Sequence, residues 1–168
     1  MSKNRVSTLA TGVLAAICLT TALAGPASAD MVGTTEGCTP GYWKNHPQSW
    51  LDNPTDTTPV YTPKTPLTVV SPQFAKSLPG ETFGGALKGG GGKGLAGATA
   101  ILARAATAAW LNSTVEIAFP YRRTTTGAGG VEGLRPLVNS ALRSGDRAVI
   151  LELATTLDNA NNLGCPLN

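Results

Sequence analysis

The strongest constraint on the fold of this 168-residue chain is the position of its last two cysteines, Cys38 and Cys165. Nearly all of the sequence that could build a folded domain lies between them. Two cysteines in an exported chain usually pair, because the environment outside the cytoplasm is oxidising. If the chain is exported, we therefore expect a Cys38–Cys165 disulfide that closes the domain. Two free thiols, or a bond between two molecules, are the alternatives.

Residues 1–29 have the three parts of a secretory signal peptide. Lys3 and Arg5 supply the positive start, residues 13–23 are apolar apart from two threonines, and Ala27-Ser28-Ala29 is a small-x-small cleavage site. The apolar stretch is shorter than the roughly 20 residues that a membrane span needs. The sequence therefore predicts a cleaved leader rather than an uncleaved N-terminal anchor, and no stable membrane insertion after cleavage.

Charge and length limit what the mature chain could be. The full chain has 13 basic and 10 acidic residues, and the loss of Lys3 and Arg5 with the leader brings the two signs close to balance. No basic cluster exceeds Arg122-Arg123, so neither nucleic acid nor an anionic membrane is an expected partner. Residues 30–168 are enough to enclose one hydrophobic core, and we expect a single secreted or cell-surface domain.

The second half of the chain is expected to form three helices. Alanine, which has the highest helix propensity, dominates residues 95–112. Apolar residues recur at helical spacing from Leu134 to Leu142, after which Gly145 ends the helix and Asp146 caps the next one. That last helix is expected to be terminated by Gly164.

The first half is expected to be mostly irregular. Prolines at positions 54, 59, 63 and 66 exclude a regular helix there and leave residues 67–70 as the only strand candidate. Short helices are predicted after Thr39-Pro40, Ser71-Pro72 and Thr82, since each offers a start signal. The expected fold is a small, mainly α single domain, with three C-terminal helices and an irregular proline-rich N-terminal half, closed by one disulfide.

Residues 41–50 gather two of the three tryptophans and the only histidine of the chain. One interpretation is an aromatic platform for sugar rings, with polar side chains beside it as hydrogen-bonding groups. The other is that the tryptophans anchor the irregular half onto the helices, as buried aromatics commonly do. We expect Trp43 and Trp110 in the core and leave Trp50 open. The candidate ligand platform comprises Tyr42, Trp43, Lys44, His46 and Trp50.

Motifs for catalysis and cofactors are weak. Gly89, Gly91 and Gly94 match G-x-G-x-x-G, but no strand is expected before them, so we interpret this segment as a surface loop and expect no cofactor. Two cysteines and one histidine fall short of four zinc ligands, and no metal is expected. A Ser–His–Asp triad would have to use His46 without a nucleophile-elbow sequence, and no spacing selects a carboxylate pair. The sequence favours a non-enzymatic module; a small secreted hydrolase acting on cell-wall or polysaccharide material is the alternative.

The two ends of the mature sequence resemble a group of exported bacterial proteins of unknown function. Residues 38–46, CTPGYWKNH, match the opening C-[ST]-x-G-[YF]-W-K-x-H, and residues 161–166, NNLGCP, match the closing N-N-x-G-C-P. This chain departs from the group in a longer linker after Tyr121 and in carrying Trp110 where an aliphatic residue is expected. The resemblance implies a secreted or surface-exposed module and no known activity. Cell-envelope components or glycans are the expected partners, and the oligomeric state is left open.

Overall fold

The computed structural model of this chain describes residues 33–52, 55–124 and 130–167. The predicted signal peptide, residues 1–29, lies outside this range. The described residues form a mainly α domain in which no β-strand occurs. Its helices are α1 (Pro40–Asn45), α2 (Phe74–Ser77), α3 (Phe83–Lys88), α4 (Gly94–Asn112), α5 (Leu134–Ser144) and α6 (Arg147–Asn161), with two 3₁₀ helices, η1 (Pro47–Ser49) and η2 (Leu67–Val69).

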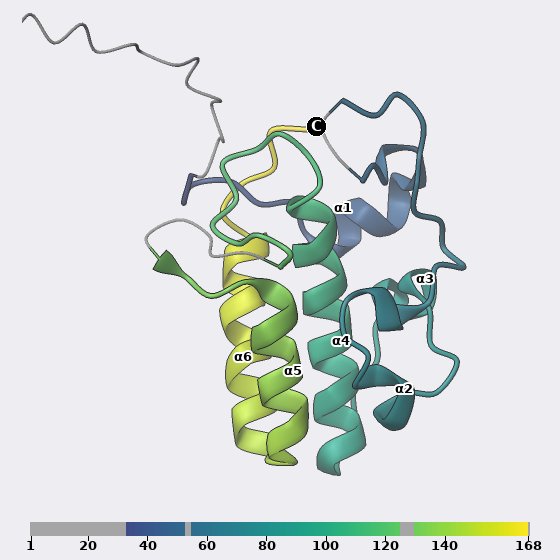
Figure 1. Cartoon of the computed structure of the whole chain (residues 1–168), viewed down its shortest axis with the longest axis vertical. Coiled ribbons are helices and arrows are strands. Elements are labelled where there is room, and N and C mark those ends of the chain that lie inside the picture. The colour runs from purple at the N-terminus through teal and green to yellow at the C-terminus, as the bar shows by residue number, and fades with distance from the viewer. Residues whose placement is uncertain (1–32, 53–54, 125–129, 168) are drawn as a thin grey trace, which may run out of the picture.

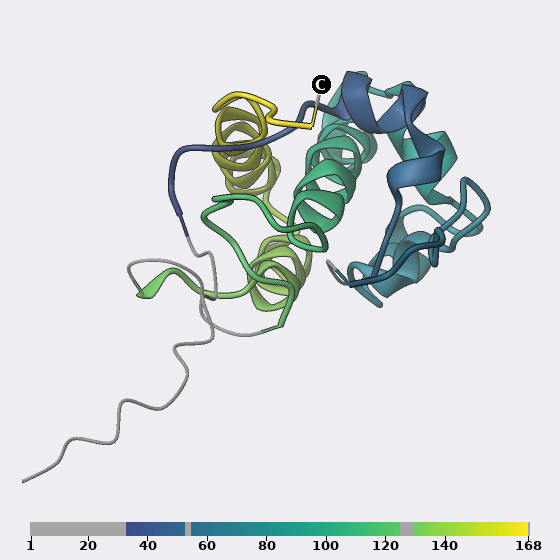
Figure 2. The same ribbon diagram turned by 90° about the horizontal axis from the view of Figure 1, so that it is seen from above.

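The long helix α4 is the centre of the domain. Figure 1 shows α4, α5 and α6 side by side, and the view from above in Figure 2 places α4 between the α5–α6 pair and the N-terminal half. Most residues of α4 are buried, and its packing against α6 is the most extensive between any two of these helices. Its many alanines explain this position, because small side chains let neighbouring helices approach from several sides.

The predicted helical hairpin at the C-terminus is confirmed. Gly145, with φ of 63°, adopts the left-handed conformation that ends α5. Asp146 then caps α6, since its carboxylate accepts a hydrogen bond from the Ala148 amide at 2.7 Å. Val138 of α5 and Ile150 and Leu157 of α6 carry the buried side of this hairpin.

The N-terminal half consists of short helices joined by irregular chain, as expected. The Thr39 hydroxyl accepts from the Tyr42 amide at 3.1 Å and caps α1, and the Thr82 hydroxyl accepts from the Gly85 amide at 3.2 Å and caps α3. Both caps are therefore as predicted. The helix predicted after Ser71-Pro72 is also present, as the single turn α2.

The strand candidate at residues 67–70 is wrong. Pro66 makes one antiparallel bridge with Thr82, and the chain then turns into η2, in which the Val70 amide bonds the Leu67 carbonyl at 3.0 Å. This turn places Leu67 and Val70, three residues apart, together in the core. An extended strand would have sent these two side chains to opposite faces.

The two ends of the domain are joined covalently, as predicted. Cys38 and Cys165 form a disulfide with their Cα atoms 4.4 Å apart, across a sequence separation of 127 residues. Gly37 pairs with Gly164 beside it, with an N···O distance of 2.9 Å. Gly37 also runs so close to α6 that a Cβ there would lie 2.1 Å from the Ala160 carbonyl oxygen. On the chain-entropy model, closing a loop of this length stabilises the fold by about 4–5 kcal/mol.

Candidate functional site

The tryptophans of the aromatic motif belong to the core. Trp43 and Trp50 are both fully buried. Each indole N–H is satisfied inside the domain, that of Trp43 by the Asn112 side-chain oxygen at 3.0 Å and that of Trp50 by the Trp43 carbonyl at 2.9 Å. The core prediction for Trp43 is confirmed, and Trp50 joins it. Neither ring has a face for a sugar, so the platform hypothesis is wrong for these two residues.

Tyr42, Lys44 and His46 are the members of the motif that reach the surface. The half-buried rings of Tyr42 and His46 stack with centroids 4.2 Å apart and planes 17° apart. His46 Nδ1 lies 2.8 Å from the Tyr42 carbonyl oxygen. Because a carbonyl only accepts, Nδ1 is the donor in this hydrogen bond. The Tyr42 hydroxyl donates to the Leu167 carbonyl at 3.2 Å, which ties this pair to the C-terminus.

The His46 ring stacks on Tyr42, and its one hydrogen bond within the described residues is to the Tyr42 carbonyl. Across residues 33–52, 55–124 and 130–167, its ring makes no hydrogen bond with a serine hydroxyl or an aspartate carboxylate. Lys44 is exposed on the same short helix. The sequence motif thus leaves a small surface made of one stacked ring pair and one ammonium group.

Asn112, which is fully buried at the end of α4, has a central role that was not predicted from the sequence. Its side-chain oxygen accepts from the Cys38 amide at 2.8 Å and from the Trp43 indole at 3.0 Å. Its amide nitrogen donates to the Cys38 carbonyl and to the Asn161 side-chain oxygen, each at 2.9 Å. Asn161 in turn donates to the Ala105 carbonyl at 3.0 Å. Asn112 therefore uses its full bonding capacity, four hydrogen bonds, to join both ends of the domain to α4.

A second polar cluster fastens the proline-rich arm to the helices, and we call it the arginine clasp. The Arg123 guanidinium pairs with the Asp52 carboxylate and donates to the Tyr61 hydroxyl at 3.1 Å, while that hydroxyl donates to Asp52. Arg123 and Arg135 both lie over the Trp110 ring, 5.7 and 5.2 Å from its centroid, at cation–π distance. Trp110 is buried, as predicted. An arginine partner on each neighbouring segment explains why an aromatic ring suits this position.

The clasp shifts the pKa values of two of its members. The hydrogen bond from Tyr61, together with Arg123, lowers the pKa of Asp52 below its ordinary value, against a smaller opposing effect of burial. Burial and the hydrogen bond to Asp52 raise the pKa of Tyr61. Both shifts favour the state in which Asp52 is ionised and Tyr61 is neutral. The carboxylate is thus held in the form that the arginine binds.

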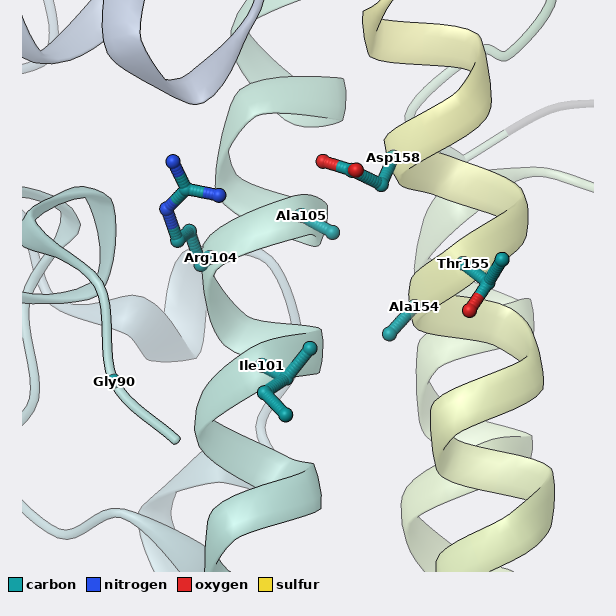
Figure 3. A pocket seen from close by; sticks show the side chains of 7 residues that line it. All are labelled: Gly90, Ile101, Arg104, Ala105, Ala154, Thr155 and Asp158. Carbon is teal, nitrogen blue, oxygen red and sulfur yellow. The ribbon is translucent and has the colours of Figure 1, made fainter. Parts of the chain in front are cut away.

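A groove of about 250 Å³ lies between α4 and α6, and Figure 3 shows the side chains that line it. Arg104 comes from α4 and Asp158 from α6, and the Asp158 carboxylate points toward α4. The buried side chains of Ala105 and Ala154 form the floor. Among the residues that the structure describes, neither charged side chain forms an ion pair or a hydrogen bond. Side chains of opposite charge thus line one opening.

A second groove of about 260 Å³ runs between α5 and α6. It contains the half-buried side chains of Leu137 and Leu153 and the exposed Val149, with Glu132 and Glu152 at its rim. The lining of this groove is apolar, and the side chains at its rim are acidic. It lacks the paired opposite charges of the α4–α6 groove.

The described residues were also compared with the requirements of a metal site and of a membrane-spanning helix. No group of three or more histidine, cysteine, aspartate or glutamate residues within that part of the chain is placed to hold a metal ion. Helix α4 is long and apolar enough to cross a membrane by length and composition, but 67% of its most apolar window is buried inside the domain, as in the core helix of a soluble protein. Comparison with models of protein families, with curated proteins and with solved structures gave no match.

Proposed function

We propose that this protein is a secreted or cell-surface non-enzymatic module that acts by binding, or as a structural part, in the cell envelope. The observation that carries the proposal is the closure of the domain by the Cys38–Cys165 disulfide together with the Asn112 hydrogen bonds. A stable disulfide of this kind belongs to oxidising compartments outside the cytoplasm. The predicted leader and the resemblance of both sequence ends to exported bacterial proteins point to the same location.

The way the domain uses its polar side chains supports a binding or structural role. Trp43 and Asn112 are committed to internal hydrogen bonds, and His46 is held by the Tyr42 carbonyl. Two solvent-facing features are the Tyr42–His46 pair with Lys44, and the charged groove between α4 and α6. These are surfaces that can hold a ligand, and we assign the recognition of envelope material to them.

Export is tested by expressing the full chain in a bacterial host and separating cytoplasm, envelope and medium. We expect a mature protein that starts at Asp30, outside the cytoplasm, with a mass two hydrogens below that of its reduced form. Intact-mass spectrometry reads both features at once. A species in the medium that retains Met1 would contradict export by a cleaved leader.

The binding role is tested by sedimenting the purified mature protein with isolated cell-wall sacculi and with insoluble polysaccharide. We expect retention of the folded protein and none of the reduced, unfolded chain. Retention that drops in Tyr42→Ala but not in Lys64→Ala, an exposed residue of the proline-rich arm, would assign the surface. Release of soluble sugars or peptides during the incubation would instead support a hydrolase.

A further inference from the structure

We infer that the groove between α4 and α6 binds a small zwitterion, such as a free amino acid or a short peptide carrying both a free ammonium and a free carboxylate. The inference deepens the proposed binding role and rests on it. Its basis is the pair of half-buried charges, Arg104 and Asp158, that line the same groove from two different helices (Figure 3). A planar guanidinium suits a carboxylate, and a carboxylate suits an ammonium.

The two charges are not neutralised by the domain itself. Among the described residues Arg123 pairs with Asp52, whereas Arg104 and Asp158 form no such pair with each other or with any other side chain. Partly buried charges usually gain stability from a partner, because they have lost part of their hydration. A ligand with one charge of each sign could serve both groups together. A simple anion would be repelled by Asp158, and a simple cation by Arg104.

The shape of the groove sets the size of the ligand. Ala105 and Ala154 form a floor of two methyl groups, and the hollow above them measures about 250 Å³. Pockets for drug-sized molecules span about 300–1,000 Å³, so this one suits a smaller compound. Ile101 lines the same groove and is 37% exposed, which offers an apolar contact for a short side chain.

The glycine-rich loop and Thr155 complete the site. Gly90 borders the groove, and a Cβ at the neighbouring Gly89 would be in ordinary van der Waals contact with the side chain of Arg104, at 3.7 Å. The absence of side chains keeps this edge open while the loop backbone lies beside the guanidinium. The Thr155 hydroxyl donates to the Leu151 carbonyl at 2.9 Å, so its lone pairs remain to accept from an ammonium group.

The test is a titration of the isotope-labelled mature protein with alanylalanine, followed by NMR. We expect shifts centred on Gly90, Ile101, Arg104, Thr155 and Asp158. N-acetylalanine lacks the ammonium and alaninamide lacks the carboxylate, and each should bind about tenfold more weakly or worse, because each loses one charge-assisted contact. Binding of N-acetylalanine as strong as that of the dipeptide would overturn the inference in favour of an anion site.

Variants separate ligand binding from folding. R104Q and D158N should each weaken alanylalanine binding about tenfold or more while leaving the melting temperature near that of the parent. The matched controls R143Q and E152Q change exposed charges on α5 and α6 and should bind normally. Unchanged binding in R104Q and D158N, or no shift in the groove at millimolar dipeptide, overturns the inference. Retention on sacculi without dipeptide binding refutes this ligand class alone and leaves the proposed function standing.

Discussion

The two halves of the domain share one apolar core but differ in regular structure and in how many polar contacts they use. The C-terminal half, α4 to α6, is a layer of helices joined by apolar packing, with alanines on α4 facing α6. In the N-terminal half, from α1 to α3, no helix among the described residues is longer than six residues, and polar contacts reach from this half to the helical layer. The difference shows how a helical core can support a region whose sequence has no regular spacing of apolar residues and which depends on contacts with the helices.

The polar contacts between the halves are specific and span long sequence separations. Each joins a side chain on the helical layer or its loop to a group in the irregular half. The contacts are Trp43–Asn112, Asp52–Arg123, Val69–Arg135 and Ser71–Asn139. Two of these contacts belong to larger clusters, since Asn112 makes four hydrogen bonds and Asp52 bonds both Arg123 and Tyr61. Removing a residue that several groups share therefore leaves several polar groups without that partner.

The most severe test of this comparison is Asn112→Ala. It should lower the free energy of unfolding by about 4 kcal/mol or more, because several buried polar groups lose their partner at once. Chemical denaturation measures this directly. The control is Ser113→Ala, whose hydroxyl bonds only the Trp110 carbonyl one turn earlier and should cost little. Equal losses in both variants would show that the network does not hold the two halves together.

Removing the disulfide should have the next largest effect. Cys38→Ser is expected to cost about 2–5 kcal/mol, the usual range for a native disulfide in a small secreted domain. Reduction of the parent protein should give a similar loss in denaturation experiments. A reduced protein as stable as the oxidised one would mean that the Asn112 network closes the domain without covalent help.

Ala106→Leu probes the helical layer itself. Ala106 is fully buried on α4, and a larger side chain there must push neighbouring elements apart. Overpacking of this kind costs about 1–3 kcal/mol. Ala100→Leu, at a partly exposed position of the same helix, is the control for helix propensity. If Ala106→Leu were neutral, the close approach of the helices would not be what stabilises this half.

The smallest expected effect concerns pH and the arginine clasp. The pKa of Asp52 is lowered from 3.8 in the folded protein, so its stabilising contribution is complete above that value and is lost as the pH falls through the lower folded pKa. The Asp52 side chain is 42% exposed, and solvent screening should keep the contribution below about 1 kcal/mol.

Melting curves between neutral pH and pH 3 check this expectation. Asp52→Asn should reduce the acid-dependent loss of stability, whereas Glu116→Gln, at an exposed position, should leave it unchanged. The protection of the Val60 and Tyr61 amides against hydrogen exchange, measured relative to the intrinsic rate at each pH, should fall first at low pH, because both amides donate to the Trp50 carbonyl. If Asp52→Asn and the parent lost the same stability in acid, the arginine clasp would not contribute to holding the proline-rich arm on the helices.

The structure of the helical C-terminal half could be predicted from the sequence more completely than that of the irregular N-terminal half. Helices α4, α5 and α6 were predictable from apolar spacing, and the caps Thr39 and Thr82 from chemistry within four residues. The η2 turn was not, because a short run of β-branched residues suits a strand as well as a turn that sends both apolar residues inward. Local pattern contains no information on a partner many residues away.

The candidate site was the least predictable part. The burial of Trp50 depends on Phe83 and Trp43 packing around it, and the groove joins Arg104 to Asp158 across two helices. The four bonds of Asn112 involve positions 49 to 74 residues distant. One clue was present: an asparagine ends the alanine-rich helix directly after Trp110 and Leu111, and a polar residue that is buried there needs hydrogen-bond partners.

The disulfide between Cys38 and Cys165 also determines how the domain would carry mechanical load. Gly37 and Gly164 lie paired beside it, so the two ends of the region that the disulfide closes lie side by side. A pulling force applied before Cys38 and after Cys165 would pass through the sulfur–sulfur bond, and the 127-residue separation would add no extension. The helices would stay unloaded, and reduction alone would expose them to the force.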